Sequence, residues 1–196
     1  MPRTVIDLVS TLLPYGTTIS TRHVCIAQGA LSAAEPFLKQ ALPAGRWHLV
    51  ADARTWPLVA PELTTQLRTA NRPYVCHIFR ENHLSPTIET ADELGALLNG
   101  SSAVVAIGAG TVNDLVKMAR SRAKLPYACI ATAPSMNGYT SAIAALLEGG
   151  VKTTRPCAPP IAVLADIDLL TRAPYRMIAA GFGDLISKPV SQADWL

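Results

Sequence analysis

The segment Ala103–Asp114 limits the possible fold more than any other part of this sequence. Its apolar start, Ala103–Ile107, predicts a buried strand, and Gly108-Ala109-Gly110 then leads into a helical pattern. Glycines at such a junction let the backbone approach a ligand, and the free N–H groups of the first helical turn attract an anion. The segment therefore predicts a phosphate-binding turn. The alternative is a tight strand–helix connection in which Thr111 and Asp114 close a capping box.

Strand and helix patterns alternate along most of the chain. This repetition predicts an α/β fold with a doubly wound, mostly parallel, Rossmann-like sheet. The other expected strands are Val24–Ala27, His48–Ala51, Tyr74–Phe79, Tyr127–Ala131 and Pro160–Ala165. Helices are expected over Ala33–Ala41, Leu58–Thr69 and Thr87–Asn99, after Gly110 and after Pro174. In the third helix, the shared apolar face is predicted to hold Ile88, Ala91, Leu94, Leu97 and Leu98.

Composition narrows the class of protein. Apolar residues make up 49% of the 196 residues and charged residues 16%, which suits a buried sheet or a surface made for another domain or subunit. The net charge of +3 comes without a basic cluster, so nucleic acid is not an expected partner. The four cysteines form no C-x-x-C pair and are expected to be free thiols. No apolar run approaches membrane-spanning length and no signal-peptide pattern begins the chain, so we expect no membrane span and a cytoplasmic location.

Two polar positions follow expected strands, where ligands bind at the carboxyl edge of α/β sheets. Asp52 follows the second expected strand, and its carboxylate could accept both hydroxyls of a ribose, could cap a helix or could be a solvated acid in a loop. The segment Thr132–Ser141 is rich in hydroxyls and follows another strand. It could hydrogen-bond a cofactor's ribose and amide, or it could satisfy its own backbone as a turn.

The segment Ala179–Lys188 has an unusual helical pattern. Two glycines and an acid, Asp184, interrupt it. Glycine in a helix costs about 1 kcal/mol relative to alanine, which indicates that something approaches this backbone closely. Asp184 is either a metal ligand or an exposed helix acid, and Pro189 is expected to break or kink the helix. The prolines at 156, 159 and 160 mark a loop near a domain boundary.

Several motifs occur together in the order and spacing of a known family. The sequence resembles the sn-glycerol-1-phosphate dehydrogenases, within the superfamily of glycerol dehydrogenase, iron-containing alcohol dehydrogenase and 3-dehydroquinate synthase. The resemblance runs from about Thr17 to Leu196. Its motifs are Gly108-Ala-Gly-Thr-Val-Asn-Asp114, Thr132-Ala-Pro-Ser-Met-Asn-Gly-Tyr-Thr-Ser141, Lys152-Thr-Thr, Ala180-Gly-Phe-Gly-Asp184-Leu-Ile-Ser-Lys188 and Asp194-Trp195.

The resemblance implies a role for each candidate residue. An NAD or NADP pyrophosphate would lie on Gly108, Ala109, Gly110, Thr111 and Asp114, and the adenosine ribose on Asp52. The nicotinamide end would be lined by Thr132, Ser135, Ser141 and Ile143. Asp184 would be a metal ligand close to the substrate, and Asn137 would contact the substrate. The metal, zinc or nickel, would polarise the oxygen of dihydroxyacetone phosphate or glycerol 1-phosphate while hydride is transferred.

The chain also departs from the family pattern. Asn113 replaces the third glycine of the dinucleotide fingerprint, and Asn137 stands where the family usually has aspartate. The family continues with an all-helical domain that carries two histidine metal ligands, so a divalent metal is expected only with that domain. We divide the chain into a nucleotide-binding domain over 1–165 and the start of a truncated helical domain over 166–196. Whether the chain is truncated or naturally short is left open, and a homo-oligomer is possible.

Other functions fit the same motifs. One is a catalytically silent nucleotide-binding or interaction domain that kept the fold. Another is a relative of glycerol dehydrogenase or dehydroquinate synthase. Two features argue against the synthase. One is the hydroxyl-rich Thr132–Ser141 segment, and the other is Asp184, where that enzyme's motif has glutamate. A small phosphorylated polyol or ketone is the expected substrate of the dehydrogenase.

Overall fold

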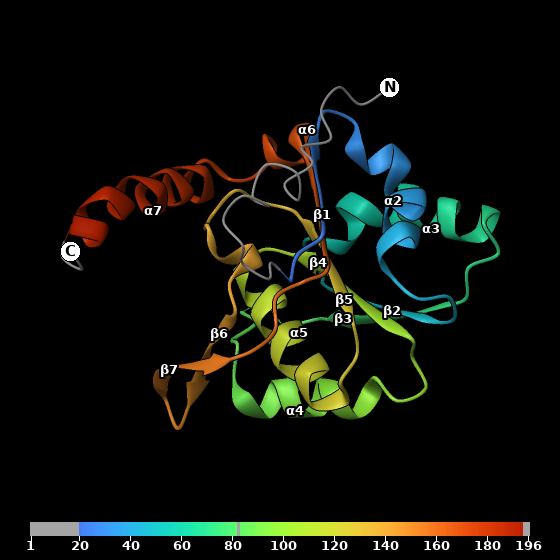
Figure 1. The fold of residues 1–196 in the computed structure, drawn as a ribbon, viewed down its shortest axis with the longest axis horizontal. Helices are drawn as coiled ribbons and strands as arrows, with labels where there is room; N and C mark the ends of the chain where they lie inside the picture. The colour runs from blue at the N-terminus through green and yellow to red at the C-terminus, as the bar shows by residue number, and fades with distance from the viewer. Residues whose placement is uncertain (1–19, 82, 194–196) are drawn as a thin grey trace.

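The chain folds around one parallel β-sheet with helices on both faces (Figure 1). The computed structural model describes residues 20–81 and 83–193. The sheet has the strand order β1-β8-β5-β4-β2-β3, and each neighbouring pair is parallel, which confirms the predicted doubly wound class. The strands are β1 (His23–Ala27), β2 (Trp47–Asp52), β3 (Tyr74–Phe79), β4 (Ala103–Gly108), β5 (Tyr127–Ala131) and β8 (Ala162–Asp166).

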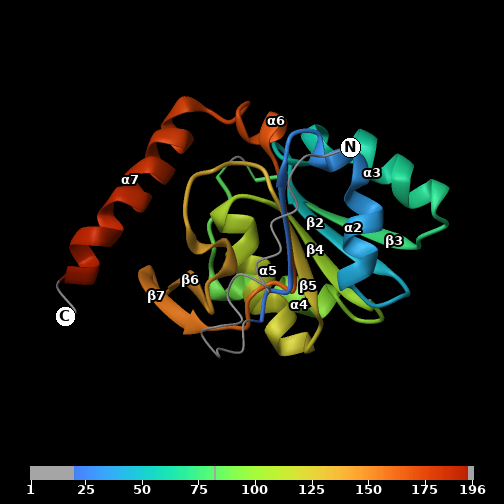
Figure 2. The same cartoon turned by 45° about the horizontal axis from the view of Figure 1, so that its top comes forward.

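Two helical layers enclose this sheet (Figure 2). One face is covered by α2 (Ala34–Ala41), which follows the short η2 (Ala30–Ala33), and by α3 (Trp56–Thr69). The other is covered by α4 (Ile88–Leu97) and α5 (Gly110–Ala123). Successive β2 residues point to opposite layers, Leu49 into one core and Val50 into the other. A strand buried on both faces must be apolar throughout, which is why β4 and β5 are continuous apolar runs.

A buried acid ties the last strand of the sheet to the first. Asp166, at the end of β8, accepts hydrogen bonds from the backbone N–H groups of Gly29 and Leu31 at 3.2 and 2.8 Å. It also caps α6 (Ile167–Leu170) by accepting from Asp168 N at 2.9 Å. This carboxylate therefore fixes the turn that follows β1.

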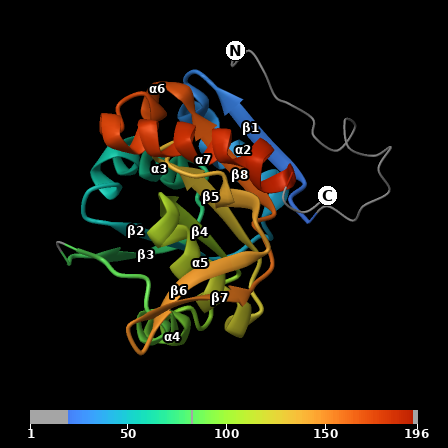
Figure 3. The same ribbon diagram turned by 90° about the vertical axis from the view of Figure 1, so that its left-hand side faces the viewer.

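A β-hairpin and a long helix lie beside the main body, on the side seen in Figure 3. The hairpin pairs β6 (Ile143–Glu148) with β7 (Val151–Pro156) through Gly149 and Gly150, which both have positive φ. This hairpin was not predicted from the sequence. Helix α7 (Tyr175–Ala193) begins after Pro174 as predicted and extends away from the sheet (Figures 1 and 2).

Two predicted details of the helices concern Leu97 and Pro189. Leu97 was assigned to the buried face of α4 but is 52% exposed. Each helical residue turns by about 100°, so Leu97 lies that far around the axis from the buried Leu98. Pro189 was expected to break or kink α7, and the helix is not broken there, since it continues through Pro189 to Ala193. Because this part of α7 is exposed, water can satisfy the carbonyl that the proline leaves without a donor.

The described helices include no membrane span. None within residues 20–81 and 83–193 is both long enough and apolar enough to cross a bilayer.

Candidate functional site

A cavity of about 590 Å³ opens at the carboxyl ends of the parallel strands. It lies where β2 and β4, which are neighbours in the sheet, send their chains to opposite faces, β2 into α3 and β4 into α5. This topological switch point is where open α/β sheets bind ligands. Six residues singled out from the sequence line it: Asp52, Ala109, Gly110, Thr111, Thr132 and Ser135.

The glycine turn leads directly into the N-terminus of α5. The helix begins at Gly110, and no side chain caps it. The capping box suggested for Thr111 and Asp114 is not formed, because the Asp114 carboxylate accepts from the N–H of Ala145 at 3.3 Å instead. The first-turn N–H groups therefore face the cavity without a protein cap, an arrangement that suits an anion.

The two glycines of this turn are needed for different contacts. A Cβ on Gly108 would stand 2.7 Å from Cβ of Val112, so this position allows close packing of β4 against its own helix. A Cβ on Gly110 would stand 3.1 Å from Sδ of Met136, in the loop that follows β5. Gly108 itself is buried behind the cavity wall, whereas Gly110 lines the cavity.

Asp52 ends β2 and shapes the turn into α3. Its Oδ1 accepts hydrogen bonds from the N–H groups of Arg54 and Thr55, both at 2.8 Å. The Thr55 hydroxyl in turn donates to the carbonyl of Ile107 in β4 at 3.0 Å. Asp52 thus organises the turn before α3 and also lines the cavity, but it does not cap the helix as the alternative interpretation expected, because the N-cap of α3 is Thr55.

The β5–β6 loop, residues 132–142, forms the opposite wall. Thr132 and Ser135 line the cavity. The Tyr139 hydroxyl donates to the carbonyl of Ala133 at 2.7 Å, which folds the loop back on itself. Ser141 and Ile143, assigned to the nicotinamide end from the resemblance, do not line the cavity and lie at the far end of the loop.

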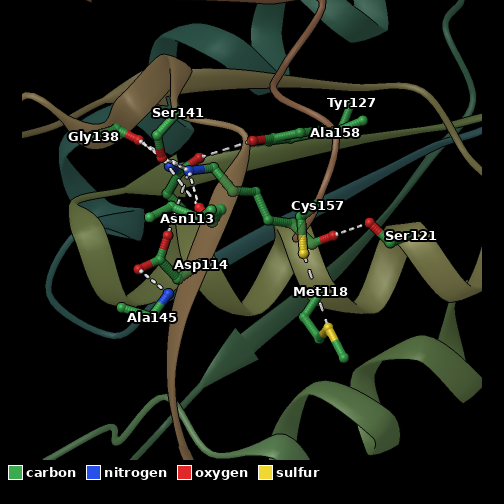
Figure 4. Close-up of polar contacts among 12 residues, drawn as sticks. Asn113, Asp114, Met118, Ser121, Tyr127, Gly138, Ser141, Ala145, Cys157 and Ala158 are labelled. Carbon is green, nitrogen blue, oxygen red and sulfur yellow. Dashed lines mark hydrogen bonds and ion pairs between the residues drawn. The ribbon is translucent and has the colours of Figure 1, made fainter. Parts of the chain in front are cut away.

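A buried polar cluster on α5 holds that far end (Figure 4). The side chain of Lys117 is fully buried, and Asp114 lies one turn before it, with 3.5 Å between Asp114 Oδ1 and Lys117 Nζ. Burial raises the pKa of Asp114 and lowers the pKa of Lys117, and the opposite charge of each partner counteracts the shift of the other. Asp114 was expected at a pyrophosphate. Because its carboxylate accepts from the N–H of Ala145, it faces β6 rather than the cavity.

Lys117 was missed by the sequence analysis. A signal for it existed, because it is the one charged residue in the otherwise apolar run Leu115–Ala119. A lysine on the buried face of a helix needs acceptors, and four are present here.

Helix α7 meets the β5–β6 loop at Asn137 and Asp184. The N–H of Asn137 donates to Asp184 Oδ2 at 2.7 Å, and Lys188 Nζ lies 3.3 Å from Oδ1. The hydrogen bond from Asn137, followed by the charge of Lys188, lowers the pKa of Asp184. Gly181 permits the approach, since a Cβ there would stand 1.7 Å from the carbonyl oxygen of Pro134. The close approach to this helix predicted from its glycines is confirmed at Gly181.

The described residues do not by themselves make a metal centre. Among residues 20–81 and 83–193, no three His, Cys, Asp or Glu side chains are grouped as metal ligands would be. Asp184 stands alone, and its two oxygens already have the partners named above. A metal does not fit this chain's described residues without ligands from elsewhere.

Charge around the cavity favours an anionic ligand. Four arginines line it, Arg54, Arg80, Arg172 and Arg176, against two acids, Asp52 and Glu81. An excess of positive charge in a concave site raises the local concentration of anions.

Comparisons with known proteins agree with this geometry. A family model described as iron-containing alcohol dehydrogenase matches residues 25–174. The chain belongs to the iron-containing alcohol dehydrogenase family. Within it, a glycerol-1-phosphate dehydrogenase (NAD(P)+) of Geobacillus thermodenitrificans (strain NG80-2) is 40% identical over 151 residues, which are 75% of this chain and 37% of that relative. The chain thus spans well under half the length of this relative.

Solved structures share the fold. Glycerol dehydrogenase from Schizosaccharomyces pombe has a TM-score of 0.72 at 18% identity, covering 84% of this chain and 42% of that one. A 2-epi-5-epi-valiolone synthase from Streptomyces hygroscopicus subsp. jinggangensis 5008, solved with NAD+ and Zn2+, has a TM-score of 0.69 at 21% identity, covering 85% of this chain and 48% of that one. At these identities the likeness shows the α/β architecture.

Proposed function

We propose that this chain is the cofactor-binding part of a metal-dependent NAD(P) oxidoreductase that interconverts dihydroxyacetone phosphate and sn-glycerol 1-phosphate. The observation that carries the proposal is the uncapped N-terminus of α5 at Gly110, opening into a cationic cavity at the switch point of the sheet. Relatives named glycerol-1-phosphate dehydrogenase (NAD(P)+) supply the reaction and the phosphorylated polyol or ketone substrate.

The lining residues suggest how a dinucleotide would bind. The N–H groups at Gly110 and Thr111 would hold the pyrophosphate, and Asp52 would accept hydrogen bonds from the adenosine ribose. Thr132 and Ser135, on the other side of α5, would lie toward the nicotinamide. When bound, NAD(P) supplies the hydride acceptor or donor. Gly108, Asp114, Ser141 and Ile143 would support this site from behind the cavity wall.

Asp184 and Asn137 would mark the substrate end. Their hydrogen bond brings a carboxylate from α7 next to the loop that forms the cavity wall. We assign Asp184 as the ligand that this chain would contribute to a divalent metal, zinc or nickel, completed by the helical domain of the family. Residues 166–196 would then begin that domain, and residues 1–165 would form the nucleotide-binding domain. We also propose a cytoplasmic location, supported by four free cysteines, and a homo-oligomer, supported by the exposed apolar residues of α7.

Titration with NADH tests the nucleotide site. Gly110→Val would place a branched side chain where the pyrophosphate is expected and against Met136, so NADH affinity should fall by about tenfold or more. Gly183→Val is the matched control, because a Cβ there meets nothing within 4 Å. Gly183→Val should bind NADH with the affinity of wild type. Equal affinity in wild type and Gly110→Val would refute the assignment.

A silent nucleotide-binding domain is the second candidate. The observation that favours it is Asn137, which lacks the negative charge that the family usually places there. Asn137→Asp in a chain joined to the remaining part of the Geobacillus thermodenitrificans relative distinguishes the two. A catalytic lineage predicts NADH-dependent reduction of dihydroxyacetone phosphate in this fusion, with or without the substitution. Activity that appears only with Asn137→Asp favours the silent domain.

A further inference from the structure

The Lys117 side chain connects α5 to the β5–β6 loop through one buried ammonium group, and two of its acceptors, Gly138 and Ser141, are labelled in Figure 4. Its Nζ donates to the carbonyl of Gly138 at 2.9 Å, to the hydroxyl of Ser141 at 2.9 Å and to the carbonyl of Ile143 at 3.0 Å. These three acceptors lie within six residues of the chain, 21 to 26 positions away from the lysine. One cation therefore gathers a single short segment.

Burying a cation here is costly. The side chain of Lys117 has no exposed surface, and desolvation lowers its pKa. An apolar side chain of similar volume would serve packing alone at least as well. The lysine instead donates to two backbone carbonyls of the loop, of which that of Gly138 also accepts from the N–H of Ser141. Its contacts specify a loop conformation.

The other half of this loop faces the candidate site. Ser135 and Met136 line the cavity, and Met136 lies against the position where Gly110 lacks a side chain. Asn137, directly before the first acceptor Gly138, donates to Asp184. The segment that Lys117 holds is thus continuous with the cavity wall and with the contact to α7.

We propose that Lys117 is a positioning residue that holds the β5–β6 loop as the wall of the cavity. It acts through Gly138, Ser141 and Ile143 and does not line the cavity itself. The helix whose N-terminus faces the ligand therefore also fixes the opposite wall. The part of this inference that concerns NADH rests on the proposed function, whereas the anchoring of the loop does not.

Hydrogen exchange measures the anchoring directly. The amides of Asn137 and Ser141 report on the loop, because their acceptors are Asp184 and the carbonyl of Gly138. In Lys117→Met, which keeps the length but removes the donors, both amides should exchange about tenfold faster or more. Leu94→Ala is the control, since it removes core volume in α4 without touching the loop. It should lower the melting temperature and leave the relative protection of the two loop amides unchanged.

NADH affinity then separates positioning from stability. Lys117→Met should bind NADH about tenfold more weakly, while folded Leu94→Ala should bind it as wild type does. If Lys117→Met does not fold, Ser141→Ala removes one of the three contacts and should give a smaller change in the same direction in both measurements.

Each outcome decides the inference. Unchanged exchange of the two amides in a folded Lys117 or Ser141 variant overturns it, and so does faster exchange with unchanged NADH affinity. If wild type itself does not bind NADH, the proposed function fails, and the exchange measurement alone decides whether Lys117 holds the loop.

Discussion

At the scale of single residues, two glycines of α7 look alike in the sequence but have different surroundings. Gly181 lies against the carbonyl of Pro134, whereas a Cβ at Gly183 would meet nothing within 4 Å. The sequence pattern predicted a close approach to this helix but could not say at which glycine, because the partner is 47 residues away along the chain. Only Gly181 is required for the contact between α7 and the β5–β6 loop.

Alanine substitution of these two glycines should give opposite results. Gly181→Ala should push α7 off the loop and cost about 1–3 kcal/mol, as overpacking does. Gly183→Ala should stabilise the helix by about 1 kcal/mol. Exchange of the Asn137 amide, which donates to Asp184, reports the contact and should accelerate only in Gly181→Ala. Protection of that amide in Gly181→Ala would show that the contact tolerates a side chain.

His48 should make the protein less stable in mild acid. Burial, followed by the charges of His77 and Arg46, lowers its pKa to about 4 in the folded state. Between about pH 6.5 and pH 4 the unfolded chain binds a proton that the folded chain does not, so stability is lost as the pH falls. The loss by about pH 4.5 should be on the order of 2 kcal/mol.

Urea unfolding of His48→Gln at about pH 7 and about pH 4.5 checks this effect. The variant should lose less stability than wild type over this interval, by roughly the same 2 kcal/mol. Other groups, including His77, are shared by both proteins and cancel in the difference. Identical losses in both would mean that His48 is protonated in the folded state.

At the scale of elements, the sequence was most informative where burial is complete. The fully buried β5 lies at its predicted bounds, because an apolar strand flanked by turn residues has few alternatives. The partly buried β3 also lies at its predicted bounds, where the alternation of its residues was the signal. The β6–β7 hairpin was not predicted, since its outer strand is exposed and carries polar residues without a regular apolar period. Its Gly149-Gly150 turn was the available signal.

In the candidate site, too, the residues that follow buried strands were predictable, and those whose positions depend on tertiary contacts were not. Asp52 and the glycine turn were predictable because both follow buried strands, and parallel strands bring their carboxyl ends to one edge. Asp114, Ser141 and Ile143 were placed by resemblance and lie outside the cavity lining. Their positions depend on Lys117, whose contacts are tertiary and leave no periodic trace in the sequence.

At the scale of the whole molecule, α7 exposes an apolar surface. Phe182, Leu185, Ile186 and Val190 are each more than half exposed. Such a surface on a helix that leads away from the body is typical of an interface. The chain covers 37% of the Geobacillus thermodenitrificans relative. We expect the remaining metal ligands to come from the part of such relatives that this chain does not cover.

Metal binding should depend on whether the further chain present in such relatives is joined to this one. The 196-residue chain should hold no stoichiometric zinc or nickel, because a single carboxylate poorly offsets the desolvation of a divalent ion. The fusion to the remaining part of the Geobacillus thermodenitrificans relative should bind one metal, and Asp184→Ala in that fusion should remove it. Elemental analysis decides both. A tightly bound metal in the unfused chain that survives Asp184→Ala would place the site elsewhere.

The pairing of β1 with β8 has a consequence for how this protein reaches its fold. The two strands are adjacent in the sheet, yet Thr21 and its acceptor Pro160 are 139 residues apart in the chain. Contacts of such high sequence separation form slowly, because loop closure must precede them. During synthesis β1 therefore emerges before the other described strands of this sheet but has no partner in it until β8 has left the ribosome. Of these described strands, the one made earliest is among the last to be placed.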